Sequence, residues 1–157
     1  MEGNTIKLHD LLPVVKEVLS SGNEFLIHPQ GISMLPYLKE GRDTVLLHPF
    51  NGAPKRGDLL LYERACGTLV LHRVVKVERD GTISFRGDNQ YFIERGIRAD
   101  QVIACVKHFY RDGKEVRVDG FASRVYRARR TLFYPWRRIS RALWRRGARL
   151  FKRGDGK

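Results

Sequence analysis

The sequence predicts a mainly β protein: a coiled, partly closed antiparallel sheet, preceded by one helix and followed by a basic amphipathic helix. Short apolar runs recur between residues 25 and 118, and the breaks Asp80-Gly81 and Asp112-Gly113 between them are typical of hairpin turns. Helical periodicity is restricted to the two ends of the chain. The 157 residues are about the size of one domain, so we expect one core unit with attachments at its ends.

Residues 1–24 are expected to form an N-terminal helical segment. Over Ile6–Leu19 the apolar residues recur at intervals of three and four positions, which is the helical period. Pro13 suits the first turn of such a helix, with Asp10 near its N-cap. The polar run 20–23 then ends it.

Residues 25–120 are expected to contain the sheet. Seven short apolar runs separated by glycine-rich or Asp-Gly breaks predict its strands. They are Phe25–His28, Thr44–His48, Leu59–Tyr62, Leu69–Val77, Thr82–Phe85, Val102–Tyr110 and Glu115–Val118. So many short strands with such turns favour a coiled, partly closed antiparallel sheet.

Residues 121–157 form a tail that carries nearly all of the excess charge. The chain has a net charge of +13; residues 1–120 contain 17 basic and 16 acidic side chains, whereas the tail contains 13 basic side chains and only Asp155. Apolar residues of the tail recur on one helical face, arginines occupy the others, and Pro135 interrupts the pattern. This pattern predicts a broken, cationic amphipathic helix.

A cationic helix of this kind has three candidate partners: an anionic membrane surface, an acidic protein and nucleic acid. Trp136, Trp144 and Phe151 lie among the arginines, an arrangement typical of the lipid headgroup boundary. We therefore expect residues 121–157 to bind an anionic membrane surface, with nucleic acid the least favoured partner. A tail that is disordered in solution is a further alternative.

The composition gives no indication of a metal, a disulfide or a cofactor. Cys66 and Cys105 lack the spacing of a zinc site or a disulfide framework, and the five histidines are scattered. Acidic residues Glu2 and Asp10 interrupt the N-terminus, so no secretory signal is expected. Because no apolar run approaches the ~18 residues of a membrane span, we expect a cytoplasmic protein, peripheral at the inner face of the membrane.

Three short segments together contain the residue types of acyl-transfer chemistry. Gly31–Pro36 contains Ser33, Leu71–Val75 contains His72, and Arg86–Asn89 contains Asp88. Each segment alone has an ordinary explanation, namely a turn or a packed strand. Together they supply a nucleophile, a base and an acid on separate elements, as covalent acyl transfer requires.

The order and flanks of these segments resemble signal peptidase I and the related self-cleaving repressor peptidases. Gly31–Pro36, with its continuation to Asp43, resembles the nucleophile box of that family, and Lys55–Tyr62 resembles its second, structural box. Leu71-His72-Arg73 occupies the place of the general base, and Gly87–Asn89 resembles the last box. The resemblance covers roughly Phe25–Val118.

This resemblance implies Ser33 as the nucleophile and His72 as the general base, as in the histidine branch of the family. Asp88 is the expected acidic partner of the histidine, with Glu94 as the alternative, because the endoplasmic-reticulum type has an acid a few residues beyond that aspartate. Gly31 stands where many bacterial members have a serine that binds the oxyanion. The oxyanion hole is therefore expected to depend on backbone N–H groups such as that of Ser33.

The expected function is a serine endopeptidase that cleaves a leader or signal-type segment from a precursor bound as an extended strand. It would use no cofactor. The alternative is a non-catalytic, peptidase-like binding or regulatory module. A DNA-linked repressor peptidase is less favoured, because residues 1–24 offer one helix and no room for a helix-turn-helix.

Overall fold

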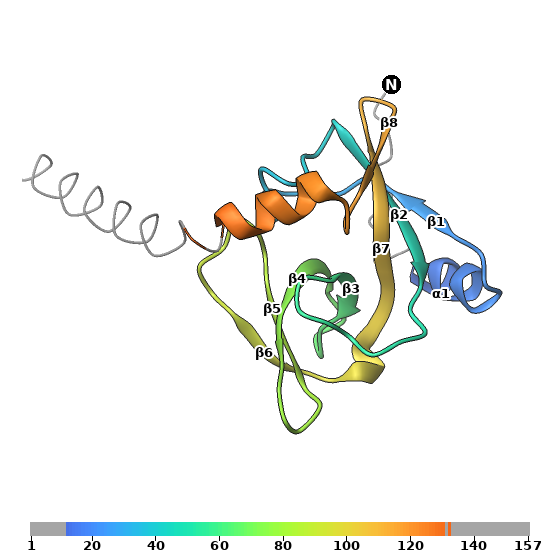
Figure 1. Ribbon diagram of the computed structural model, residues 1–157. Helices are drawn as coiled ribbons and strands as arrows, with labels where there is room; N and C mark the ends of the chain where they lie inside the picture. The colour runs from blue at the N-terminus through green and yellow to red at the C-terminus, as the bar shows by residue number, and fades with distance from the viewer. Residues whose placement is uncertain (1–11, 131, 133–157) are drawn as a thin grey trace, which may run out of the picture. The chain divides into compact units, whose positions relative to one another are not determined.

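The structure is a computed structural model that describes residues 12–130 and 132. The chain divides into two compact units, Met1–Gly120 and Phe121–Lys157, which are described separately. The first unit contains a helix and an antiparallel sheet of eight strands (Figure 1). In the second unit residues 121–130 are helical. The prediction of a mainly β chain with a helix at each end is confirmed.

The elements of the first unit follow one another along the chain, and the longest connection between two strands is residues 28–42, which include Ser33. They are α1 (Leu12–Ser20), β1 (Phe25–Ile27), β2 (Asp43–Pro49), β3 (Leu59–Glu63), β4 (Leu69–Val77), β5 (Ile83–Arg86), β6 (Glu94–Ile97), the 3₁₀ helix η1 (Ala99–Gln101), β7 (Val102–Arg111) and β8 (Lys114–Arg117). The strand order is β1-β2-β7-β3-β4-β5-β6, with β8 paired to β7. The first and last strands of this order do not pair, so the sheet is not closed into a barrel.

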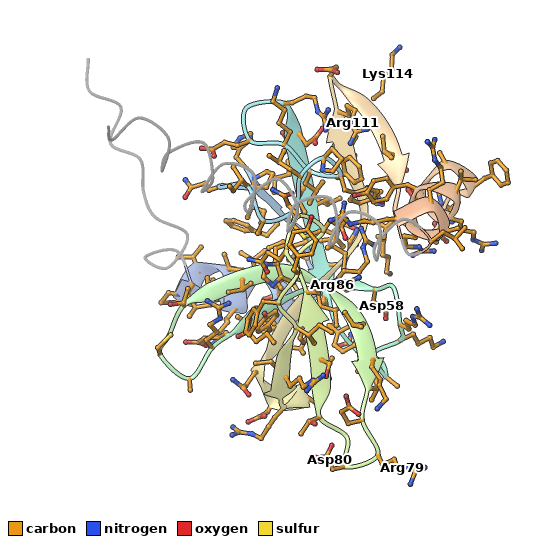
Figure 2. The ribbon with its side chains drawn as sticks, turned by 90° about the vertical axis from the view of Figure 1, so that its left-hand side faces the viewer. Asp58, Arg79, Asp80, Arg86, Arg111 and Lys114 are labelled. Atoms are coloured by element: carbon orange, nitrogen blue, oxygen red, sulfur yellow. The ribbon has the colours of Figure 1, made fainter. Side chains whose placement is uncertain are left out.

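Both predicted hairpin turns are confirmed. Asp112 and Gly113 have φ angles of 50° and 75°, the left-handed backbone that a tight turn between β7 and β8 requires. At the β4–β5 turn the Asp80 carboxylate accepts hydrogen bonds from the backbone N–H and the hydroxyl of Thr82. Figure 2 shows Asp80 and Lys114, which mark the two turns, at opposite ends of the unit.

Each of the seven apolar runs corresponds to a strand, but β6 was not predicted. Its sequence, Glu94-Arg95-Gly96-Ile97, contains one buried apolar residue, too few for a hydrophobic period to be visible. It pairs with β5 through Ile83↔Ile97 and Phe85↔Glu94. Strand pairing therefore places Glu94 opposite Phe85 on the last strand of the sheet, which the local sequence did not indicate.

The core lies against the central strands. Leu60, Tyr62, Val74 and Phe85 belong to one buried cluster contributed by β3, β4 and β5. The rings of Tyr62 and Phe85 stack with centroids 4.2 Å apart and an interplanar angle of 21°. Packing on this scale fixes the side chains of β3 and β4, and these two strands carry much of the candidate site.

The helices agree in part with the expectations. In α1 the residues Leu12, Val15 and Leu19 are buried at the predicted three- and four-residue spacing. Residues 1–11, and the segment around Pro135, lie outside the described residues. Within the described ranges, none of the helices combines the length and the apolar character that crossing a membrane requires.

Candidate active site

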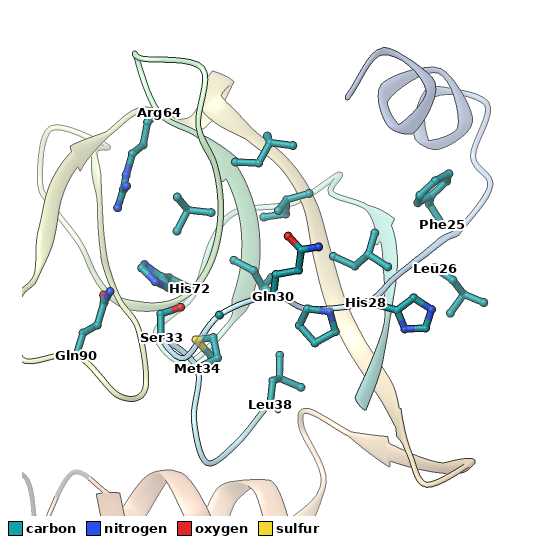
Figure 3. Close-up of a pocket in the computed structure, with 17 residues that line it drawn as sticks. Phe25, Leu26, His28, Gln30, Ser33, Met34, Leu38, Arg64, His72 and Gln90 are labelled. Atoms are coloured by element: carbon teal, nitrogen blue, oxygen red, sulfur yellow. The ribbon is translucent and has the colours of Figure 1, made fainter. Parts of the chain in front are cut away.

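A pocket of about 550 Å³ contains both Ser33 and His72 in its walls (Figure 3). Most of its lining is apolar, supplied by β1, by the start of β4 and by the segment that follows Ser33. The polar groups of Arg64 and Gln90 are also part of the lining. A concavity lined mainly by apolar side chains, with a few polar groups among them, is the usual form of a ligand site.

Ser33 lies in a turn that is held by the loop after β5. The backbone N–H of Asn89 donates to the carbonyl oxygen of Ser33 at 2.7 Å, and the Asn89 side-chain amide donates to the carbonyl of Ile32 at 3.2 Å. On the other side the Gly31 N–H donates to a Glu40 carboxylate oxygen at 2.9 Å. Three hydrogen bonds thus fix the backbone around Ser33 before any ligand is bound.

Gly87 permits the close approach of the two loops. A Cβ atom at Gly87 would lie 2.7 Å from the Ser33 carbonyl oxygen and 3.0 Å from the side-chain amide carbon of Gln90. Both separations are shorter than a carbon atom can occupy without displacement of its neighbours. The Gly87–Asn89 segment is therefore packed directly on the turn that carries Ser33.

Gly87→Ala is expected to lower the free energy of unfolding by about 1–3 kcal/mol, the usual cost of overpacking. Gly52→Ala is the matched control, because a Cβ atom there meets nothing within 4 Å. Equilibrium denaturation in urea measures both variants. Equal stability of the two would contradict the packing of the Gly87 loop on Ser33.

His72 lies in β4, directly opposite Leu60 of β3, and is only 2% exposed. Its Nδ1 atom lies 3.3 Å from the hydroxyl oxygen of Tyr62. Among the described residues no hydrogen bond joins Ser33 to His72, and such contacts often tighten only when substrate binds. The structure thus brings Ser33 and His72 into one pocket, with Nδ1 of the imidazole already engaged.

Burial lowers the pKa of His72 from 6.5 to about 4, because desolvation disfavours the imidazolium. Glu94 acts in the opposite direction through its negative charge, and the charge of Arg64 opposes Glu94. At neutral pH the imidazole is therefore uncharged and able to accept a proton.

Glu94 is connected to His72 through Tyr62. The Tyr62 hydroxyl donates to Glu94 Oε2 at 2.7 Å. Arg64 Nε and Nη2 donate to the two Glu94 oxygens, each at 2.6 Å. Chiefly because of Arg64, the pKa of Glu94 lies below its ordinary value, so the carboxylate is ionised.

Asp88 is held by a different cation. Its two carboxylate oxygens accept hydrogen bonds from Arg73 Nε at 3.0 Å and Nη2 at 2.9 Å. Arg73 also donates to the carbonyl oxygen of Gly57, and its guanidinium lies 4.6 Å from the centroid of the Tyr37 ring. Both charged side chains are buried. Asp88 thus forms an ion pair with Arg73 of β4, whereas Glu94 is linked to His72 through the Tyr62 hydroxyl.

Three residues of the site were not identified from the sequence: Tyr62, Arg64 and Gln90. Tyr62 falls in the segment that resembles a structural box, and only its position two residues after Leu60 on the same face of β3 indicates that it can reach His72. Gln90 follows Gly87-Asp88-Asn89 directly, and its side-chain oxygen accepts a hydrogen bond from the Gly87 N–H at 3.4 Å.

In the described part of the chain, no group of three or more His, Cys, Asp or Glu side chains is arranged to hold a metal ion. Cys66 and Cys105 are both free thiols.

The fold and the site together define an open antiparallel sheet with a serine and a buried, neutral histidine in one apolar pocket. Comparison with protein-family models, with curated proteins and with solved structures gives no match to this chain. The resemblance to signal peptidase I therefore stays a prediction.

Proposed function

We propose that this protein is a serine endopeptidase that removes a leader or signal-type segment from a precursor peptide or protein. The observation that carries the proposal is the shared pocket, in which Ser33 from a fixed turn and the uncharged His72 of β4 line the same cavity. A serine is a weak nucleophile unless a base accepts its proton, and His72 is the base that the pocket offers.

In the proposed reaction Ser33 Oγ attacks a peptide carbonyl while Nε2 of His72 accepts the hydroxyl proton. The oxyanion of the tetrahedral intermediate is bound by backbone N–H groups, including that of Ser33. The C–N bond then breaks as His72 transfers its proton to the leaving amine. Water, deprotonated by His72, hydrolyses the acyl ester and regenerates the Ser33 hydroxyl.

Of the two acids, Glu94 is the one that the geometry favours as the partner of His72. An arginine binds both oxygens of each acid, but only for Glu94 does the structure give a link to the imidazole, through the Tyr62 hydroxyl. We therefore propose Glu94 in the acidic role and Asp88 as the buried partner of Arg73.

The pocket suits an extended peptide with apolar side chains. β1 is the end strand of the sheet, and β5 pairs with β4 only from Arg73 onward, so residues 69–71 have no partner strand on that side in the described chain. Both of these free strand edges line the pocket. A substrate strand can add to such an edge through main-chain hydrogen bonds. By analogy with the family that the sequence resembles, small residues precede the cut.

The test is a peptide-library digestion read by mass spectrometry. We expect the wild-type protein to cleave a subset of peptides that share residues before the cut, and His72→Gln, which keeps the side-chain volume but removes the base, to cleave none. Binding of peptides without cleavage by the wild-type protein would instead support the non-catalytic binding module.

The pH dependence of cleavage follows from the buried base. Protonated His72 cannot accept the serine proton, so kcat/KM is expected to fall as the pH drops through about 4 and to stay constant between about pH 6 and 8. A half-maximal rate near pH 6.5, the ordinary histidine value, would contradict the buried neutral base.

Stability has to be followed in the same experiment. A depressed histidine pKa contributes stability that is complete above pH 6.5 and is lost as the pH falls toward 4. Circular dichroism at each pH separates the loss of fold from the protonation of the base.

We also propose that residues 121–157 hold the protein at an anionic membrane surface, on the inner face of the membrane. In the helix of residues 121–130 and at Leu132, exposed apolar residues recur on one face: Phe121 is 83%, Val125 40% and Leu132 75% exposed. The full segment contains 13 basic side chains and one acid. Each basic side chain near an anionic leaflet contributes about 1 kcal/mol.

Vesicle binding tests this proposal. The full-length protein is expected to bind anionic phosphatidylserine-containing vesicles at low salt and to be released at high salt, with a blue shift of Trp136 and Trp144 fluorescence. A variant ending at Gly120 is expected not to bind. If the full-length protein ignores these vesicles but binds duplex DNA or an acidic protein, the membrane proposal is wrong.

A further inference from the structure

Tyr62 occupies an unusual position for a core tyrosine, because its hydroxyl lies between a base and an acid. The hydroxyl oxygen is 3.3 Å from His72 Nδ1 and 2.7 Å from Glu94 Oε2. Tyr62 is fully buried, and its ring stacks on Phe85. The ring is therefore held in place by packing, and the position of the hydroxyl is fixed along with it.

The number of protons in this chain of groups determines the tautomer of His72. A phenol has one proton, and Tyr62 donates it to the ionised Glu94. Towards His72 the hydroxyl oxygen can then only accept, so Nδ1 must carry the imidazole proton. The second nitrogen, Nε2, is left with a free lone pair. Burial and the hydrogen bond to Glu94 raise the pKa of Tyr62, so the phenol keeps its proton.

Arg64 keeps this chain of groups in one protonation state. Its two hydrogen bonds to Glu94 orient the carboxylate with one oxygen toward Tyr62. The Glu94 side chain is 14% exposed and that of Arg64 35%, so it is the carboxylate of the pair that is shielded from water. Without Arg64, a shielded carboxylate would have a raised pKa and could donate to Tyr62 instead of accepting from it.

We propose that Tyr62 is a positioning residue, which holds His72 in the Nδ1–H tautomer and transmits the charge of Glu94 to the imidazole. This inference rests on the proposed peptidase function for its role in turnover. When His72 accepts the serine proton on Nε2, the imidazolium is stabilised by Glu94 through the Tyr62 hydroxyl. No proton passes through the phenol in this scheme, so each group returns to its starting state.

The competing explanation is that Tyr62 is a core residue whose hydroxyl merely satisfies Glu94. Tyr62→Phe distinguishes the two, because it removes one oxygen and keeps the ring stacked on Phe85. Tyr110→Phe is the matched control, since Tyr110 lies on β7 and does not line the pocket.

The decisive measurement is the tautomer of His72, read by NMR from the nitrogen–carbon-proton correlations of ¹⁵N-histidine-labelled protein at neutral pH. We expect protonated Nδ1 and unprotonated Nε2 in the wild type and in Tyr110→Phe, and a mixture that contains the Nε2–H form in Tyr62→Phe. A wild-type Nε2–H tautomer, or an unchanged tautomer in Tyr62→Phe, would overturn the proposal. Because this readout needs no substrate, it stands or fails separately from the peptidase function.

Turnover provides the second readout. With a cleaved library peptide, Tyr62→Phe is expected to lower kcat by about 10- to 100-fold, the effect of losing one hydrogen bond to a charged network, with KM unchanged. Thermal unfolding monitors the contribution of the hydroxyl to stability. A loss of stability with kcat unchanged at a temperature where the variant is folded would assign Tyr62 a structural role only.

Discussion

Ser33→Ala is expected to lower kcat/KM for a cleaved peptide by at least ~1000-fold, because removal of a catalytic nucleophile leaves only binding and oxyanion stabilisation. The free energy of unfolding is expected to change by less than about 0.5 kcal/mol, as for most substitutions without buried partners. The turn itself is held through the backbone of Ser33, which alanine also provides.

Ser21→Ala is the control for this experiment. The Ser21 hydroxyl donates to the Glu17 carbonyl at the end of α1 and does not line the pocket. The rate is followed by mass spectrometry and the stability by urea denaturation on the same preparations. Cleavage by Ser33→Ala at the wild-type rate would exclude Ser33 as the nucleophile and leave the pocket without the proposed chemistry.

The second large effect separates the two acids. Asp88→Asn is expected to lower the free energy of unfolding by about 3–5 kcal/mol, because it leaves the buried Arg73 charge without a carboxylate. Where the variant is still folded, its kcat is expected to stay within a few-fold of the wild type. Urea denaturation and steady-state kinetics at low temperature measure the two quantities.

Glu94→Gln is expected to lower kcat rather than the free energy of unfolding. Its amide oxygen can still accept from Tyr62, so the tautomer of His72 is kept, but the negative charge that stabilises the imidazolium is lost. We expect kcat to fall by about 100-fold or more, since such an acid supports the charge formed in the transition state. If Asp88→Asn instead removes activity without a loss of stability, Asp88 is the acid and the assignment of Glu94 is wrong.

Much of the fold was accessible from local sequence patterns. The apolar runs identified seven of the eight strands. A buried strand contains apolar residues whichever strand it pairs with, so such a run is visible in the local sequence. Both Asp-Gly turns follow from the backbone angles that such residues tolerate. Glu94-Arg95-Gly96-Ile97 was missed because it becomes a strand through pairing with β5, which is a non-local interaction.

The candidate site, like the fold, could be predicted only in part from the sequence. Ser33 and His72 were identified because a nucleophile in a turn and a histidine in a strand are visible as residue types in order, and the structure places both in one pocket. The choice between Asp88 and Glu94 was not accessible, since it depends on which arginine each acid meets. Arg73 is opposite Arg86 at the end of β5, next to the Asp88 loop, whereas Arg64 follows β3 and meets β6.

Local sequence patterns and composition predict seven of the eight strands, the order of the candidate boxes and the division between a nearly neutral body and a cationic tail, because each of these depends on nearest neighbours or on composition. Three further contacts follow from the folded chain alone: Tyr62 lies between His72 and Glu94, Asp88 pairs with Arg73, and Gly87 packs on Ser33. These contacts join residues from different strands and loops. Their partners are set by the register of the sheet, which depends on the packing of the whole core.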